Sequence, residues 1–166
     1  MSAGLVIGIG GNVGSEDEIL ERFRRARAAL EALGSVRSAP LYRSQPVGPA
    51  QPPYLNTAVR VEVAPDTQPG ELIATLLELE RLLGRRRPHA RWGPRAIDLD
   101  VLVWGERVVR TPELEVPHPR LIERRFALEP VVALLGPALE IPGHGPAGAL
   151  LSRLHDQAVE QIAETW

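Results

Sequence analysis

Two aspartates interrupt a short apolar stretch near the middle of this chain. Asp98 and Asp100 alternate with Ile97, Leu99 and Val101, and this period of two predicts a strand that carries both carboxylates on one face. Two like charges this close together repel each other and resist burial unless a cation lies between them. Magnesium suits such a pair, because it binds one or two carboxylates and fills its remaining positions with water and phosphate oxygens.

Arginines precede the two aspartates and supply the opposite charge. They are Arg85, Arg86, Arg87, Arg91 and Arg95. Guanidinium groups bind phosphate oxygens bidentately, so carboxylates for a metal and arginines for a phosphate chain together indicate Mg-ATP. A bare Asp-x-Asp more often belongs to a solvated strand at a sheet edge. The arginine cluster and the adjoining Trp92-Gly93-Pro94 segment favour the nucleotide here.

Composition limits the possible classes of protein. A chain of 166 residues is expected to form one domain, residues 1–166, with a single core. Its net charge of -2 argues against nucleic-acid binding, and its lack of cysteine excludes thiolate catalysis and disulfides. No apolar run has membrane-spanning length and no signal peptide is recognisable. We therefore expect a cytoplasmic protein, most simply a monomer, that binds small molecules.

All 19 basic residues are arginine, because the sequence contains no lysine. A Walker A loop and a protein-kinase fold each require a particular lysine, so both are excluded. Schiff-base chemistry is excluded for the same reason. If this protein binds ATP, it does so with magnesium and arginine.

Hydrophobic periodicity predicts alternating elements. Strands are expected at residues 5–10, 36–42, 54–63 and 97–104, with a short fifth strand near Val108. Helices are expected from the Ser15/Glu18 capping box to about Leu33, and from about Pro69 to Gly84. The order β-α-β-β-α-β predicts an α/β (α+β) fold, a ferredoxin-like sandwich with helices packed on an antiparallel sheet. A proline-punctuated extension follows from residue 111, and its last helix is expected at about 147–163.

The glycine turn at the end of the first strand does not indicate dinucleotide binding. Gly8 and Gly10 begin a G-x-G-x-x-G pattern, but Val13 occupies the third glycine position. A sharp strand-to-helix turn is the better explanation. His118 lies between Pro117 and Pro119, which restrict its backbone. The residues alone leave a functional and a structural role for it equally open.

Several short motifs together are similar to one known family. They are Gly10-Gly11-Asn12, Tyr42-Arg43-Ser44, Tyr54-Leu55-Asn56, Glu80 before Gly84-Arg85, residues 91–100, Val116-Pro117-His118-Pro119 and Arg124-Arg125-Phe126. With them the chain resembles the 6-hydroxymethyl-7,8-dihydropterin pyrophosphokinase (HPPK) family of folate biosynthesis. The resemblance implies a ferredoxin-like fold. It also implies transfer of a pyrophosphoryl group from ATP to the pterin hydroxymethyl group, which releases AMP.

The resemblance also implies roles for individual residues. Two Mg²⁺ ions would bind Asp98 and Asp100, and Arg85 and Arg95 would join them in catalysis. The ATP-binding residues would be Glu80, Arg85, Arg87, Arg91, Arg95, His118 and Arg124. The pterin-binding residues would be Ser44, Val47, Tyr54, Asn56, Trp92 and Phe126. The amide of Asn56 would match the polar edge of the pterin. Tyr54 and Phe126 would flank its ring, although plain core packing is the alternative for both.

Four positions depart from the pattern of the family. Gly11 replaces a frequent serine, and Pro88, Pro119 and Ile122 replace a lysine, a tyrosine and a histidine found in some members. Two other classes also remain open. A two-metal nucleotidyltransferase on a ferredoxin-like base would release pyrophosphate rather than AMP. A non-catalytic RNA-binding module needs exposed aromatic residues and a basic face, which two Phe, two Tyr and an acidic balance disfavour.

Overall fold

The computed structural model describes residues 3–46, 48–85 and 93–166. Within them, six strands form one antiparallel sheet in the order β10-β3-β4-β1-β5, and β2 pairs with β4 beside β3. The strands are β1 (Ala3–Gly11), β2 (Val36–Ser38), β3 (Leu41–Ser44), β4 (Tyr54–Val63), β5 (Asp98–Trp104) and β10 (Val159–Ala163). The ferredoxin-like arrangement predicted from the sequence fits this sheet.

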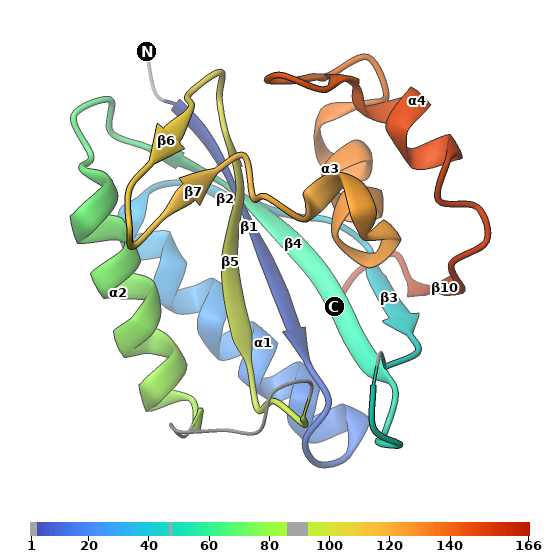
Figure 1. The fold of residues 1–166 in the computed structure, drawn as a ribbon. Helices are drawn as coiled ribbons and strands as arrows, with labels where there is room; N and C mark the ends of the chain where they lie inside the picture. Colours follow the sequence, from blue (N-terminus) through green and yellow to red (C-terminus); the bar gives the residue numbers. More distant parts are fainter. Residues whose placement is uncertain (1–2, 47, 86–92) are drawn as a thin grey trace.

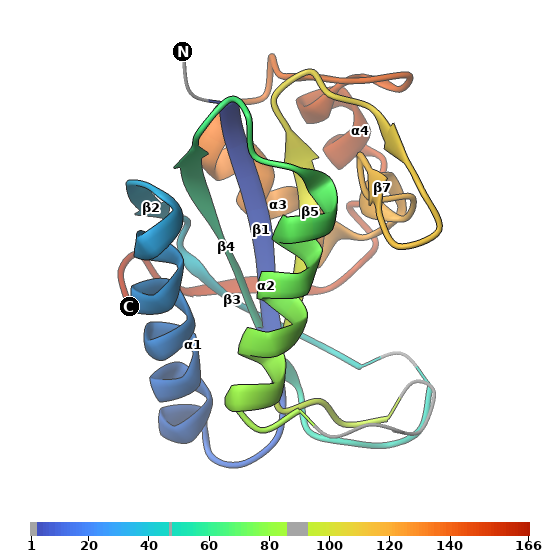
Figure 2. The ribbon, with the colours of Figure 1, turned by 90° about the vertical axis from the view of Figure 1, so that its left-hand side faces the viewer.

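Helices α1 (Glu16–Leu30) and α2 (Pro69–Leu82) cover one face of the sheet (Figures 1 and 2). Each helix presents an apolar stripe, with Phe23 of α1 and Leu76 of α2 fully buried against the strands. The side chain of Ser15 accepts a hydrogen bond from the Glu18 N–H at 3.2 Å, so the predicted cap is present. A 3-10 turn (Glu31–Leu33) follows α1 and ends at Gly34.

Helices α3 (Arg125–Leu135) and α4 (Ala147–Ser152) lie on the opposite face (Figure 2). Leu128 and Val131 of α3 pack in one cluster with Val6, Ala58 and Leu102 of the sheet. β1 finishes at the same end of the sheet at which β4 and β5 begin. Figure 1 shows that this end of the sheet extends beyond α3. A 3-10 turn (Leu121–Glu123) leads directly into α3. The backbone N–H of His118, just before this turn, donates to the carbonyl of Leu102 on β5, which brings this approach to α3 beside β5.

The predicted strand at 36–42 is two strands. β2 ends at Ser38 and β3 begins at Leu41, and both pair with β4. The break falls at Pro40, which has no N–H to donate to the neighbouring strand. The side-chain hydroxyl of Thr57 donates to the carbonyls of Ala39 and Pro40 there, at 3.2 and 2.8 Å.

The predicted C-terminal helix is wrong beyond Ser152. α4 ends there, and residues 159–163 form the edge strand β10 instead, paired with β3. The apolar stripe expected of a helix was weak in this segment, and pairing with the free edge of β3 satisfies its backbone groups. Trp166 then packs edge-on against Phe23, with ring centroids 6.1 Å apart.

Four short strands of the described residues lie outside the main sheet. β6 (Val109–Arg110) pairs with β7 (Glu115–Val116), and β8 (Glu140–Ile141) pairs with β9 (Gly145–Pro146). The strand predicted near Val108 is therefore β6, which belongs to a separate two-stranded ribbon. In the described part of the chain, no helix has the length and apolar character needed to cross a membrane.

Candidate active site

Asp98 and Asp100 lie at the start of β5 on the same face of the sheet. In the antiparallel register, Asp98 pairs with Gly10 and Asp100 with Gly8 of β1. Leu99 between them is buried in the core beneath α1 and α2, so both carboxylates point to the opposite face, the one that carries α3. The alternation predicted from the sequence is confirmed.

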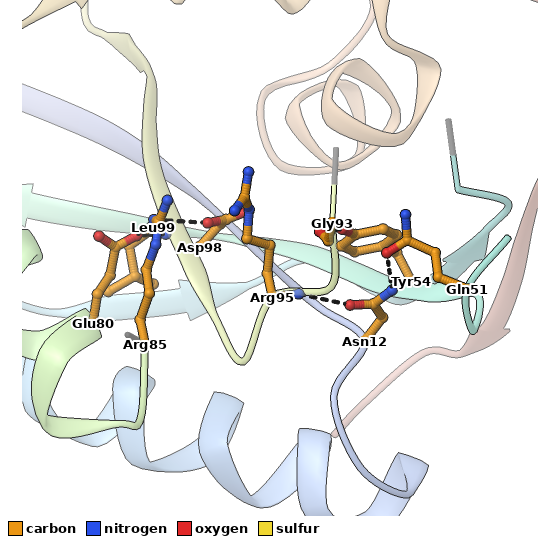
Figure 3. Close-up of polar contacts among 9 residues, drawn as sticks. All are labelled: Asn12, Gln51, Tyr54, Glu80, Arg85, Gly93, Arg95, Asp98 and Leu99. Carbon is orange, nitrogen blue, oxygen red and sulfur yellow. Dashed lines mark hydrogen bonds and ion pairs between the residues drawn. The ribbon is translucent and has the colours of Figure 1, made fainter. Parts of the chain in front are cut away.

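Arginines surround the Asp98 carboxylate (Figure 3). Nη1 of Arg85 lies 2.7 Å from Oδ1 of Asp98, and Nε of Arg95 lies 3.9 Å from Oδ2. Both guanidinium groups are largely buried, with 14% and 16% of their side chains exposed. Ion pairs this shielded from solvent are screened far less by salt than surface pairs.

Glu80 of α2 contacts this cluster through its buried carboxylate. Its Oε2 accepts hydrogen bonds from the N–H of Leu99 at 2.8 Å and from Nη1 of Arg85 at 2.7 Å. The side chain is buried, and burial raises the pKa of its carboxyl group, opposed by the Leu99 and Arg85 contacts. Glu80 therefore holds both an arginine and the residue between the two aspartates. Its predicted direct contact with ATP stays a prediction.

Asp100 faces the start of α3. Burial raises the pKa of Asp100, while the charges of Arg124, Arg85 and Arg95 oppose the rise. The side chain nevertheless has exposed surface, so solvent reaches a carboxylate that the surrounding protein partly desolvates. Burial also lowers the pKa of Arg124, and Arg120 adds to that effect, whereas Asp100 counteracts it. Arg85, Arg95 and Arg124 therefore surround the two aspartates as a cationic group.

His118 is held in one orientation close to Arg124. The backbone N–H of His118 donates to the carbonyl of Leu102 at 2.9 Å. Nδ1 of its ring accepts from the backbone N–H of Arg120 at 3.1 Å. Burial lowers the pKa of His118 to about 4, with Arg124 and Arg120 contributing. At neutral pH the ring is therefore uncharged, and because Nδ1 accepts a hydrogen bond, Nε2 carries the proton. His118 can act as a neutral donor.

The residues predicted to bind the pterin lie on neighbouring strands. Nδ2 of Asn56 donates to Oγ of Ser44 at 3.1 Å, and both side chains are buried. Tyr54 donates its hydroxyl to the carbonyl of Gly93 at 3.1 Å. Burial raises the pKa of Tyr54, and the charge of Asp98 adds to the rise. Phe126 is half-buried in the first turn of α3, with its ring centroid 5.7 Å from Cζ of Arg124.

Asn12, which has no role among the predicted site residues, links two loops at the site (Figure 3). Its N–H donates to the carbonyl of Arg95, and its Oδ1 accepts from the N–H of Arg95, both at 2.9 Å. Its Nδ2 donates to Oε1 of Gln51 and to the carbonyl of Pro52, also at 2.9 Å. The available signal was the Gly-Gly-Asn turn. A Cβ on Gly11 would lie 2.6 Å from the carbonyl oxygen of Ala96, which explains the glycine.

Four predicted site residues, Val47, Arg87, Arg91 and Trp92, lie outside the described residues. The others divide into a charged group and a polar-aromatic group on the same face of the sheet. In the described ranges, no three His, Cys, Asp or Glu side chains gather in a way that could hold a metal.

Most of the chain is similar in sequence to known proteins. Residues 6–136 match the family model of 7,8-dihydro-6-hydroxymethylpterin-pyrophosphokinase (HPPK). A 2-amino-4-hydroxy-6-hydroxymethyldihydropteridine pyrophosphokinase of Pseudomonas aeruginosa is 33% identical over 157 residues, 94% of each chain. The enzyme of the same name from Synechocystis sp. is 37% identical over 134 residues, 79% of this chain and 66% of its own length.

Larger proteins also contain this unit. A mitochondrial folate synthesis bifunctional protein of Pisum sativum is 40% identical over 139 residues, 82% of this chain but 26% of that protein. Wild-type Plasmodium falciparum HPPK-DHPS, solved with pteroate, has a TM-score of 0.67 at 10% identity and covers 99% of this chain and 47% of that one. This structural likeness shows the fold alone. The chain thus spans about two thirds, or less, of several relatives that it matches. On the family model and the relatives together, it belongs to the 7,8-dihydro-6-hydroxymethylpterin-pyrophosphokinase (HPPK) family.

Proposed function

We propose that this protein transfers the pyrophosphoryl group of Mg-ATP to the hydroxymethyl group of 6-hydroxymethyl-7,8-dihydropterin, in folate biosynthesis. The products are the pterin diphosphate and AMP. The observation that carries the proposal is the pair Asp98 and Asp100 on one face of β5, with arginines from three segments around it. The Pseudomonas relative, which is matched over nearly its full length, carries the corresponding name.

The carboxylate pair fits magnesium. The two carboxylates offer hard oxygen ligands. Burial disfavours the charged form of Asp100, and a bound cation would compensate for this cost. When bound, two Mg²⁺ ions would neutralise triphosphate charge and orient the phosphate chain. Arg85 now neutralises Asp98, so phosphate oxygens and Asp98 would compete for its guanidinium group.

The remaining polar residues suit a phosphate chain. Arg95 and Arg124 can each donate two parallel hydrogen bonds to phosphate oxygens. His118 adds a neutral Nε2–H donor, which does not have to lose a charge to enter a desolvated site. Arg87 and Arg91 are expected to contribute from the segment between Arg85 and Gly93. During transfer, these donors would stabilise the negative charge that develops on the AMP leaving group.

The polar and aromatic residues suit a flat heterocycle. Asn56 carries an amide donor and acceptor in a buried setting, and such a site rejects ligands that leave its polar groups unpaired. Tyr54 and Phe126 can stack on the ring. Backbone groups near Ser44 and Val47 are expected to complete the pocket, and Trp92 is expected to cover it. The charge of Asp98 adds to the rise in the pKa of Tyr54, so the two residues lie near each other, as neighbouring pterin and ATP sites would require.

The test is to incubate the purified protein with ATP, magnesium and 6-hydroxymethyl-7,8-dihydropterin and to identify the products. AMP and the pterin diphosphate are expected. Release of inorganic pyrophosphate would instead indicate a nucleotidyltransferase, and a shift of labelled RNA without turnover would indicate a binding module. The variant Asp100→Asn is the negative control, because it removes one metal ligand and keeps the size of the side chain.

We also infer that the protein acts as a cytoplasmic monomer that binds no nucleic acid and no membrane. The net charge of -2 supports the absence of nucleic-acid and membrane binding, because the anionic surfaces of nucleic acids and membranes attract strongly basic proteins. Sedimentation equilibrium of the purified protein tests the monomer, and cell fractionation tests the compartment. A stable dimer at micromolar concentration would contradict the first inference.

A further inference from the structure

The segment between α4 and β10 contacts the candidate site from a distant part of the sequence. Gln157 lies in this segment, two residues before Val159, which pairs with Ser44 of β3. The segment follows the region matched by the family model, residues 6–136. It therefore joins the strand that carries Ser44 to the start of α3, where Arg124 and Phe126 lie.

Gln157 makes three hydrogen bonds to the residues on either side of Arg124. Its Oε1 accepts from the N–H of Arg125 at 2.9 Å, and its Nε2 donates to the carbonyl of Glu123 at 2.8 Å. Its own carbonyl accepts from Nη1 of Arg125 at 2.8 Å. The backbone that leads into and out of Arg124 is therefore fixed on both sides.

The start of α3 explains why a distant side chain is needed. The first N–H groups of a helix have no partner within the helix, and a Ser, Thr, Asp or Asn at the N-cap usually accepts one of them. Arg124 is the N-cap of α3, and its side chain makes no capping hydrogen bond. A guanidinium group has no acceptor. Gln157 accepts from the first N–H instead, which leaves Arg124 free to direct its charge toward Asp100.

We propose that Gln157 is a positioning residue that orients the guanidinium group of Arg124 and the ring of Phe126 for the transfer reaction. The inference rests on the proposed function, in which Arg124 binds phosphate and Phe126 stacks on the pterin. Arg124 lies between Glu123 and Arg125, the two residues that Gln157 contacts, and Phe126 follows Arg125. Loss of the Gln157 hydrogen bonds should therefore displace Arg124 and Phe126 together. A displacement on the order of 1 Å can lower the rate of an enzyme by about a hundredfold.

The first experiment measures AMP release by Gln157→Ala at saturating magnesium. We expect kcat/KM to fall by about tenfold, with a higher KM for the pterin and a lower kcat. Gln161→Ala is the matched control, because Gln161 is exposed on β10 in the same C-terminal segment, and it should retain wild-type kinetics. Gln157→Glu keeps the acceptor for Arg125 but loses the donor to Glu123, so its kcat/KM should lie between those of wild type and Gln157→Ala.

A double-mutant cycle separates positioning from a general effect on folding. In an Arg124→Ala background, Gln157→Ala should lower kcat by no more than about twofold, because the phosphate-binding group that it orients is already gone. The rise in KM for the pterin should remain in that background, because it depends on Phe126. The proposal would be overturned if Gln157→Ala lowered kcat as much in that background as in the wild-type background, or if Gln157→Ala alone had wild-type kinetics. Thermal unfolding of each variant establishes that it is folded at the assay temperature. If Arg124→Ala itself is fully active, the proposed role of Arg124 fails; if only Gln157→Ala is fully active, that role stands.

Discussion

The buried carboxylate of Glu80 gives the sharpest test of how this site is held together. A single oxygen, Oε2, accepts hydrogen bonds from both Leu99 and Arg85. Replacement by alanine removes that acceptor and leaves the N–H of Leu99 buried without a partner. Replacement by glutamine keeps an oxygen that can accept both hydrogen bonds, but removes the charge and replaces the other oxygen by an amide NH2 group. The two variants therefore separate the hydrogen bonds from the ionic interaction.

The expected magnitudes follow from the surroundings of Glu80. An unsatisfied buried N–H costs about 1–3 kcal/mol, and the small cavity left by the side chain adds to this, so Glu80→Ala should lower the free energy of unfolding by about 2–4 kcal/mol. Burial raises the pKa of Glu80, which means that the protein disfavours the charged form. Arg85 keeps its ion pair with Asp98 when the charge of Glu80 is removed, so Glu80→Gln should remain within about 1 kcal/mol of wild type at pH 7.

Urea unfolding followed by circular dichroism measures these differences. Glu78 provides a matched control, because it lies on the same helix but is exposed, and it pairs with Arg81 on the surface; its alanine variant should show no resolvable change. AMP release should fall much further for Glu80→Ala than for Glu80→Gln, since only the former loosens Leu99 between the two aspartates. Equal urea midpoints for Glu80→Ala and Glu78→Ala would refute the reasoning.

Three further predictions concern the metals, the loops and pH. Asp98→Asn and Asp100→Asn should each abolish turnover, and near-normal turnover at saturating magnesium would count against the metal assignment. Asp100→Asn should unfold like wild type, because it removes a like charge as well as a ligand, whereas Asp98→Asn also removes the charge that pairs with Arg85 and should be the less stable of the two. Asn12→Ala should lower the free energy of unfolding by about 2–4 kcal/mol and raise the KM for both substrates, since it releases both loops at once; unchanged urea midpoints would contradict this. The pKa of His118 is lowered to about 4 from 6.5, so the unfolded state binds more protons between these values. Stability should therefore fall as pH drops from about 6.5 to about 4, by at most about 3 kcal/mol, and a His118→Asn variant unfolded over the same range should lack that component.

Local patterns in the sequence carried much of the fold and part of the site. The period of two around Asp98 and Asp100 predicted one shared face, and the register with β1 confirms it. The cap at Ser15 and the apolar stripe of α1 were likewise readable, because they depend on residues three or four positions apart. The strand at 36–42 was only partly predicted, since the effect of Pro40 depends on the strand with which it pairs.

The sequence by itself determined the types of chemical group and their local faces: two carboxylates on one strand, arginine as the only basic residue, and motifs that identify a family. Tertiary structure alone decided which distant groups meet. Glu80 reaches Leu99 and Asn12 reaches Arg95 because α2 and the β1 turn pack beside β5. Residues 159–163 form a strand rather than a helix because β3 offers a free edge. Such contacts join residues that are tens of positions apart in the sequence, so the spacing of apolar and polar residues within one helix or strand cannot predict them.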